Sequence, residues 1–146
     1  MGEKYQEYIH LLGEAIINYQ LVEHNLRYIL AAIDAGDFKI NLADSYVKIK
    51  GLGQLINEIE KIDLEKKLNF FSPKSYKILK ELAKDRNKYC HSSVLDFAYL
   101  KDFENSDAFI NQLNKLKIDH DNLLSLQIQT ENIRIDTLKG YILKAK

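Results

Sequence analysis

The sequence predicts an all-α protein, a bundle of four or five helices with long N- and C-terminal helices. The chain of 146 residues contains one proline and six glycines, so few residues interrupt a helix. Apolar residues recur at three- and four-residue steps over long stretches, which is the helical period. The length is typical of one domain, and we expect residues 1–146 to form a single helical domain.

The first helix is expected from about residue 3 to residue 35. An apolar stripe runs along it, and Gly36 then supplies a common helix-ending signal. Glu23 falls within this stripe, where a carboxylate is unusual. The stripe consists of Tyr5, Tyr8, Ile9, Leu12, Ile16, Tyr19, Leu26, Ile29, Leu30 and Ile33.

A second helix is expected from about residue 42 to residue 62. Gly51 and Gly53 lie inside it, and each costs about 1 kcal/mol relative to alanine in a helix interior. Two glycines in one turn indicate either a kink or a close helix crossing, and of the two we favour the crossing. The side chains expected to face inward are Tyr46, Ile49, Leu52, Leu55, Ile56 and Ile59.

Ser72 and Pro73 predict the start of a third helix, with Ser72 as N-cap and Pro73 at the first helical position. This helix is expected to end near Ser92 or Ser93, and residues 94–99 then form a connector with large apolar side chains. Residues 106–145 keep an approximate helical period, either as one long helix or as two helices broken near residues 119–122. The apolar positions of this last segment are Phe109, Leu113, Leu116, Leu123, Leu126, Ile133 and Tyr141.

The lengths of the two terminal helices predict a homodimer. A helix of 33 residues spans ~50 Å at 1.5 Å per residue, whereas a compact domain of this size is ~30 Å across. The overhanging apolar stripes must be buried somewhere, and a second copy of the chain is the simplest partner.

Composition and charge limit the classes of function. Lys plus Arg equals Asp plus Glu at 21 each, so the sequence lacks the basic field that supports non-specific nucleic-acid binding. Cys90 is the single cysteine, which favours a reducing cytoplasm. No signal-peptide pattern and no run of ~18 apolar residues is present, so we expect a soluble, cytoplasmic protein without membrane contact.

The most informative segment is residues 86–91, Arg-Asn-Lys-Tyr-Cys-His, near the end of the third helix. Arg86 occupies an apolar slot of a stripe that also contains Leu79, Leu82, Ala83 and Cys90. An arginine that points inward requires a partner, and Glu23 of the first helix is the best candidate.

Arginine and histidine together suit phosphate chemistry, since one binds two phosphate oxygens and the other transfers a proton near neutral pH. Residues five apart lie ~140° apart on a helix, so Arg86 must reach around or meet His91 of a second chain. Asn87 and His91 share one face. The alternatives are structural: Arg86 only pairs with a buried acid, and His91 only caps free carbonyls at the helix end.

Residues 86–91 resemble the Arg-polar-x3-His signature of the HEPN superfamily, helical ribonuclease-like domains of toxin–antitoxin and phage-defence systems. The surroundings agree over residues 3 to about 100. A long first helix carries the acid Glu23, and residues 48–56 read Lys-Ile-Lys-Gly-Leu-Gly-Gln-Leu-Ile. The signature then ends a third helix and is followed by the small residue Ser92.

The resemblance implies a HEPN-like fold and a metal-independent endoribonuclease without cofactor. In active members, the Arg and His of two protomers line a cleft along the dimer axis. The ribose 2′-OH attacks the adjacent phosphate and leaves a 2′,3′-cyclic phosphate and a 5′-OH. Carried over, His91 is the general acid/base, Arg86 binds the scissile phosphate, Asn87 orients the site, and Glu23 and Ser92 support it. The implied partners are an RNA substrate and an antitoxin or other inhibitory protein.

Two further hypotheses stay open beside this one, a non-catalytic interaction module with the HEPN fold and an unrelated helical bundle. Members paired with a minimal nucleotidyltransferase often carry a tyrosine two residues after the histidine, where this chain has Ser93. Regulation by AMP transfer to that position is therefore disfavoured. His24, Cys90, His91 and His120 do not have the spacing of a zinc site.

Overall fold

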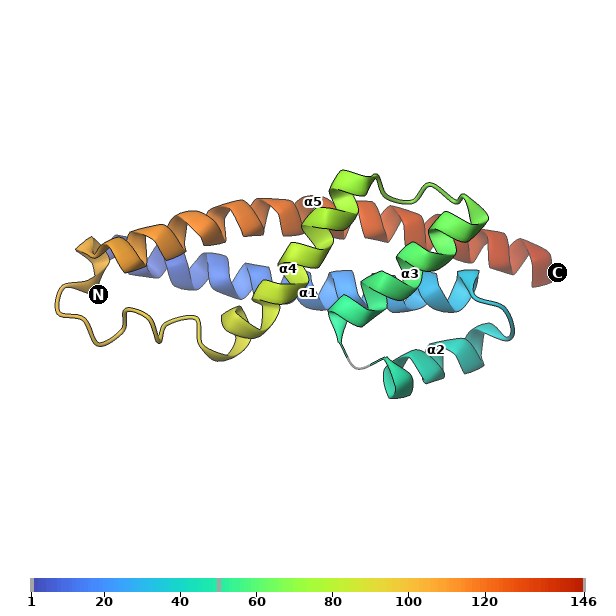
Figure 1. The fold of residues 1–146 in the computed structure, drawn as a ribbon, viewed down its shortest axis with the longest axis horizontal. Coiled ribbons are helices and arrows are strands. Elements are labelled where there is room, and N and C mark those ends of the chain that lie inside the picture. Colours follow the sequence, from blue (N-terminus) through green and yellow to red (C-terminus); the bar gives the residue numbers. More distant parts are fainter. Residues whose placement is uncertain (1, 50, 146) are drawn as a thin grey trace.

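The computed structural model describes residues 2–49 and 51–145, and for residues 141–145 it describes the backbone only. This part of the chain contains five α-helices, one short 3-10 helix and no strand, which confirms the predicted all-α class. In chain order the elements are α1 (Glu3–Ile33), α2 (Phe38–Lys48), α3 (Leu52–Lys66), α4 (Pro73–His91), η1 (Phe103–Asn105) and α5 (Asp107–Ala145) (Figure 1).

The two longest helices, α1 and α5, lie side by side and run in the same direction (Figure 1). Near their N-terminal ends the Tyr8 and Phe109 rings are 5.7 Å apart, and farther along Asn25 donates a hydrogen bond of 3.1 Å to Thr130. At ~1.5 Å per residue, α5 is ~58 Å long. Residues 107–145 form one helix without a break at residues 119–122, so the single long helix is the correct alternative.

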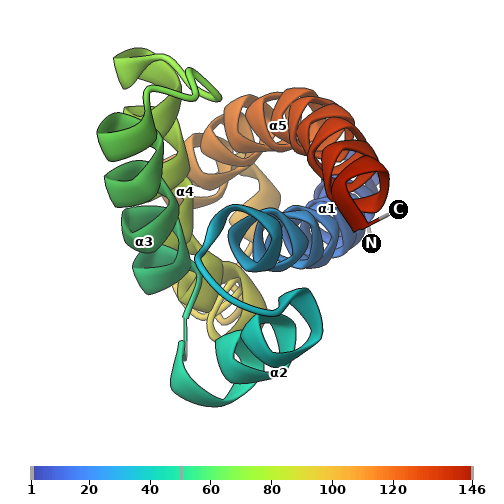
Figure 2. The same cartoon turned by 90° about the vertical axis from the view of Figure 1, so that its right-hand side faces the viewer.

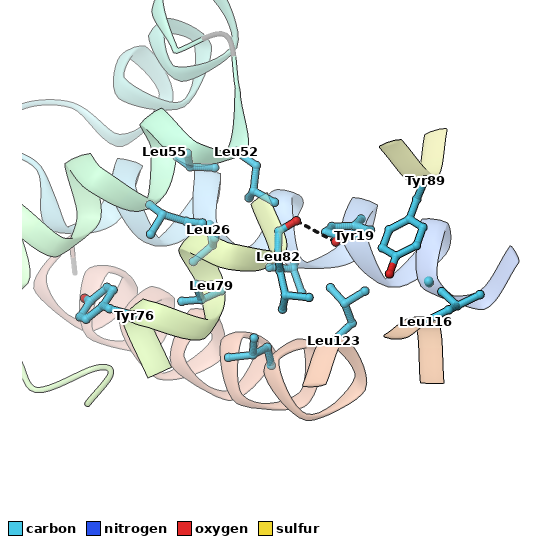
Figure 3. Packing of buried hydrophobic residues seen from close by; sticks show 14 of the residues in the cluster. Tyr19, Leu26, Leu52, Leu55, Tyr76, Leu79, Leu82, Tyr89, Leu116 and Leu123 are labelled. Atoms are coloured by element: carbon cyan, nitrogen blue, oxygen red, sulfur yellow. Dashed lines mark hydrogen bonds between the residues drawn. The ribbon is translucent and has the colours of Figure 1, made fainter. Parts of the chain in front are cut away.

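Helices α3 and α4 pack against each other and cross one side of the α1 and α5 pair, while α2 packs on α1 (Figure 2). The hydrophobic core lies where these layers meet, and every long helix contributes to it (Figure 3). Its fully buried large side chains are Tyr8, Tyr19, Tyr89, Phe97, Phe109, Leu26, Ile29, Leu55, Ile56, Ile59, Leu79 and Leu116.

The helix ends follow from local chemistry. Ser72 caps α4 as predicted, because its Oγ accepts a hydrogen bond of 3.1 Å from the amide of Ser75. Asp37 caps α2 in the same way, through a 3.0 Å bond from the amide of Ile40. After α1, Gly36 adopts φ 106°, a left-handed conformation that glycine accepts without steric cost.

The predicted second helix over residues 42–62 is wrong, because two helices occupy this stretch. Helix α2 begins earlier, at Phe38, and ends at Lys48, and α3 begins at Leu52. Gly51 is the extended N-cap of α3, with φ −150° and ψ 159°. A Cβ added to Gly51 or Gly53 would meet no heavy atom within 4 Å, so the favoured close helix crossing is also absent.

The break changes which side chains of this region are buried. Tyr46, expected to face inward, is 57% exposed, and Ile49 is a half-buried C-cap residue of α2. Leu52, Leu55, Ile56 and Ile59 are buried as predicted. Lys50, part of the segment compared with the HEPN pattern, lies outside the described residues, as does the side chain of Tyr141.

The connector after α4 is anchored by one aromatic side chain. Phe97 is fully buried, with its ring centroid 5.5 Å from Tyr8 and 5.0 Å from Phe109. Leu95 and Tyr99, by contrast, are 51% and 77% exposed. None of the helices in residues 2–49 and 51–145 combines the length and the apolar character that crossing a lipid bilayer requires.

A histidine–carboxylate pair joins α1 to α5 near their middle. His120 Nε2 lies 2.5 Å from Glu14 Oε2, His120 Nδ1 lies 3.4 Å from Asp121, and His10 lies 2.9 Å from the other Glu14 oxygen. Burial by itself lowers the pKa of His120, but the hydrogen bonds with Glu14 and Asp121 outweigh it and raise that pKa above 6.5. The bond with His120 also lowers the pKa of Glu14 below 4.5.

We expect this pair to make folding stability depend on pH. Because the pKa of His120 is raised by folding, its contribution is full below pH 6.5 and is lost as pH rises through the folded pKa. Because the pKa of Glu14 is lowered by folding, its contribution is full above pH 4.5 and is lost at lower pH. In denaturant unfolding, His120→Gln should therefore lose folding stability at about pH 5.5 and lose almost none at about pH 9. An equal loss at both pH values, or the same profile in His24→Gln, would contradict this assignment.

Candidate functional site

Helix α4 carries Arg86, Asn87 and His91, and two tyrosines on its inner face hold it in place. The hydroxyl of Tyr76 donates a 2.5 Å hydrogen bond to Asp63 of α3. The hydroxyl of Tyr89 donates a 2.5 Å hydrogen bond to Asp119 of α5. Both carboxylates are buried, so the rotation of α4 about its axis is defined at both ends.

Two tyrosines of α1 also bind the backbone of α4 and of the residue after its end. The hydroxyl of Tyr19 donates a 2.8 Å hydrogen bond to the carbonyl of Leu82 (Figure 3). The hydroxyl of Tyr8 donates a 2.7 Å bond to the carbonyl of Ser93, just beyond the helix end. The backbone from Leu82 to Ser93 is therefore fixed to α1 at two points.

The structure corrects the predicted inward position of Cys90. Cys90 is exposed, and Tyr89 is the buried residue of that turn. Tyr89 lies seven positions after Leu82, which keeps both on one helix face. The eighth position turns Cys90 ~80° away from Leu82.

Arg86 points from α4 toward Glu23 of α1, so the expected pairing is present. Its Nη2 atom lies 4.0 Å from Glu23 Oε2. The Arg86 side chain is 34% exposed, so Arg86 is only half-buried and not fully inward as the apolar stripe suggested. A cation at the edge of ion-pair distance, with a third of its side chain in solvent, can still bind an anion.

The tighter partner of Glu23 is Arg27, which sequence reasoning missed. Arg27 Nη2 lies 3.2 Å from Glu23 Oε1, and its guanidinium also donates to the carbonyls of Ser45 and Ile49 at the end of α2. The guanidinium lies 4.7 Å from the centroid of the Tyr46 ring, and only 7% of the Arg27 side chain is exposed. The spacing of Glu23 and Arg27, four residues apart on one helix, was the available sequence signal.

Asn87 and His91 are exposed, and within residues 2–49 and 51–140 neither side chain has a hydrogen-bond or ion-pair partner. The end of α4 is capped by Ser92, whose amide and hydroxyl both donate to the carbonyl of Lys88, at 2.9 and 3.4 Å. His91 therefore does not serve as the capping group, which was its structural alternative. Its imidazole is available for another role.

Arg86 and His91 do not meet within one chain. Arg86 is directed to α1, whereas His91 projects into solvent, in agreement with the ~140° that separates positions five apart. Neither residue lines any of four cavities found on the described part of the chain, one of about 510 Å³ being bounded by Ile33, Lys66 and Gly140. In a single chain Arg86 and His91 thus lie outside these four cavities, with His91 on an exposed surface.

Asp85 on α4 and Asp119 on α5 share one lysine as their ion-pair partner. Lys115 lies 2.6 Å from Asp85 and 3.0 Å from Asp119. Burial alone lowers the pKa of Lys115, but the hydrogen bonds with both acids outweigh it and raise that pKa. Burial, followed by the bond with Asp119, raises the pKa of the Tyr89 phenol, which stays a donor at neutral pH. Lys115 therefore offsets one of the two negative charges of Asp85 and Asp119.

Within the described residues, no group of three or more His, Cys, Asp or Glu side chains is arranged to hold a metal ion. The histidines considered as zinc ligands, His24 and His120, have different neighbours. His24 contacts the Tyr28 ring at 4.6 Å between centroids, and His120 pairs with Glu14.

Comparison of the chain with protein-family models, with curated proteins and with solved structures finds no match.

Proposed function

We propose that this chain is a metal-independent endoribonuclease with a HEPN-like fold, acting on RNA as a toxin or defence effector. The observation that supports this best is the end of α4. There Arg86 is held loosely at 4.0 Å by Glu23, and one turn further the His91 imidazole is exposed. A permanently charged cation and a free proton-transfer group on one helix are the two components that cleavage of RNA through its 2′-OH requires.

In the proposed reaction the 2′-oxygen forms a bond to the adjacent phosphorus, and the bond from phosphorus to the 5′-oxygen breaks. His91 accepts the 2′-OH proton as the first bond forms and returns it to the leaving 5′-oxygen as the second bond breaks, so protons balance over the reaction. Arg86 binds the phosphate oxygens on which charge develops. Asn87 orients the phosphate from the face that it shares with His91, while Glu23 and Ser92 support Arg86 and the helix end.

The proposed site is composite and lies between two copies of the chain. The separate directions of Arg86 and His91 in a single chain support this proposal. The connector that continues from His91 adds apolar contact surface for a partner, since Leu95, Tyr99 and Leu100 are 51%, 77% and 42% exposed. A two-fold axis near α4 would bury this surface and bring His91 of each copy toward Arg86 of the other.

The zero net charge of the chain favours a narrow range of substrates, such as single-stranded or looped RNA. An antitoxin or other inhibitory protein is the proposed regulator. The same exposed apolar residues favour a second candidate, a non-catalytic interaction module with this fold, because they need only a partner surface and no chemistry.

Cleavage by the purified protein should persist in EDTA and should leave a 2′,3′-cyclic phosphate and a 5′-OH, because the proposed chemistry uses only the 2′-OH and two side chains. A matched RNA with hydrogen in place of the 2′-OH at the cut position should not be cleaved there. Product ends can be identified by mass spectrometry. Cleavage that requires magnesium, or that proceeds without the 2′-OH, would contradict the mechanism, and no cleavage of any RNA would favour the interaction module.

Mixing two inactive variants tests the composite site. Arg86→Ala supplies an intact His91, and His91→Ala supplies an intact Arg86, so a mixed dimer regains one complete site if the site uses both chains. Activity should rise when the two variants are mixed and should be absent in either alone. The double variant mixed with wild-type chain is the control. No recovery, together with a monomeric mass near 17.0 kDa in light scattering, would exclude the composite site.

A further inference from the structure

Arginine is rare in this chain, and two of its three arginines meet at one carboxylate. The arginines are Arg27, Arg86 and Arg134, and the remaining 18 of the 21 Lys and Arg residues are lysines. Glu23 contacts Arg27 through Oε1 at 3.2 Å and Arg86 through Oε2 at 4.0 Å. Each oxygen of this carboxylate thus faces a different guanidinium.

The two arginines are held very differently. Arg27 is buried, donates to two backbone carbonyls of the α2 end as well as to Glu23, and lies over the Tyr46 ring. Arg86 is 34% exposed, and within the described residues Glu23 at 4.0 Å is its one ion-pair partner. Arg27 is therefore fixed, whereas Arg86 can exchange its partner.

We propose that Glu23 competes with an incoming oxyanion for Arg86, and that Arg27 is the positioning residue that permits this exchange. The proposal rests on the proposed function, in which the oxyanion is a phosphodiester of RNA. When the anion binds Arg86, Glu23 loses a partner while still 79% shielded from solvent. Because Arg27 continues to pair with Glu23, the exchange leaves no uncompensated carboxylate near the anion.

This arrangement predicts opposite changes in anion affinity for substitutions of Glu23 and Arg27. Removing the charge of Glu23 frees Arg86 and should strengthen anion binding. Removing the charge of Arg27 leaves Glu23 with Arg86 alone and should weaken anion binding. A purely structural Glu23 would give weaker binding or no change in both cases, so the increase for Glu23→Gln distinguishes the two roles.

The experiment follows the Nε–H signals of the arginines by NMR while inorganic phosphate is added to the full chain. Three arginines give a simple spectrum, and Arg86 is identified by its loss in Arg86→Lys. Arg134, which donates a 2.9 Å hydrogen bond to Asn25, is the internal reference. In Glu23→Gln the dissociation constant of phosphate at Arg86 should fall about two- to fivefold, the effect of one partly exposed ion pair.

Glu60→Gln is the matched control, because Glu60 is 26% exposed and pairs with Lys80 on α4 rather than with Arg86. It should leave the constant unchanged. Arg27→Met should raise the constant by a similar factor, and Arg27→Lys should restore most of the loss. If Arg27→Met does not fold, Glu23→Gln alone decides.

Unchanged or weaker phosphate binding in Glu23→Gln would overturn the exchange, as would the absence of any Arg86 shift up to about 100 mM phosphate. The measurement contains no RNA, so it fails independently of the ribonuclease. Tighter binding without RNA cleavage would leave the exchange in place and exclude the enzyme. RNA cleavage without tighter phosphate binding in Glu23→Gln would support the enzyme and exclude the exchange.

Discussion

Replacement of His91 by alanine is expected to lower the rate of RNA cleavage by ~10²-fold or more, the usual scale for loss of a general acid or base. Folding should be unaffected, because His91 is exposed and its side chain makes no hydrogen bond or ion pair with the described residues. Exposed substitutions of this kind change stability by ~0.5 kcal/mol or less. The initial cleavage rate should therefore fall, whereas the denaturant unfolding curve should not change.

His24→Ala is the matched control for this prediction, since His24 is also an exposed histidine but lies on α1. It should retain full activity and full stability. A His91→Ala protein that cleaves RNA at the wild-type rate would remove the proton-transfer role. A His91→Ala protein that is unfolded would instead give the imidazole a structural role that its exposure does not suggest.

The long helices could be predicted because their signal is local and repeated. Residues 3–33 and 107–145 keep an apolar period over many turns, and Ser72 with Pro73 marks the start of α4. The period alone leaves open whether the last segment is one helix or two. The α2–α3 break could not be predicted in the same way. Gly51 is compatible with a kink, a crossing or an N-cap, and only the packing of α2 on α1 decides among them.

The candidate site was predictable in part for the same reason. The pairing of Arg86 with Glu23 followed from two charged residues in two apolar stripes. The buried Arg27 did not follow, because its acceptors are carbonyls of Ser45 and Ile49, which are backbone groups that any residue type carries. A contact between side chain and distant backbone leaves no pattern in the sequence.

Replacement of Phe97 by alanine is expected to cause the largest loss of stability in the region of the site, about 3–5 kcal/mol. Phe97 is fully buried, and its ring meets Tyr8, Phe103 and Phe109 with centroids 5.0 to 5.5 Å apart. The contacts with Tyr8 and Phe109 are edge-to-face and the contact with Phe103 is stacked, and such pairs add ~0.5–1.5 kcal/mol each beyond the burial of apolar area. Against a total stability of ~5–15 kcal/mol, the loss should appear clearly in urea unfolding.

Tyr99→Ala is the matched control, because Tyr99 is an aromatic residue of the same connector but is 77% exposed. Its loss should stay within ~0.5 kcal/mol. Phe97 reaches the core only two residues after Leu95 and four after Ser93, whose carbonyl accepts the bond from Tyr8. The same cluster therefore holds both the connector and the end of α4. A loss below ~1 kcal/mol for Phe97→Ala would mean that the connector is not anchored there. His91 would then lack the rigid support that a composite site between two chains requires.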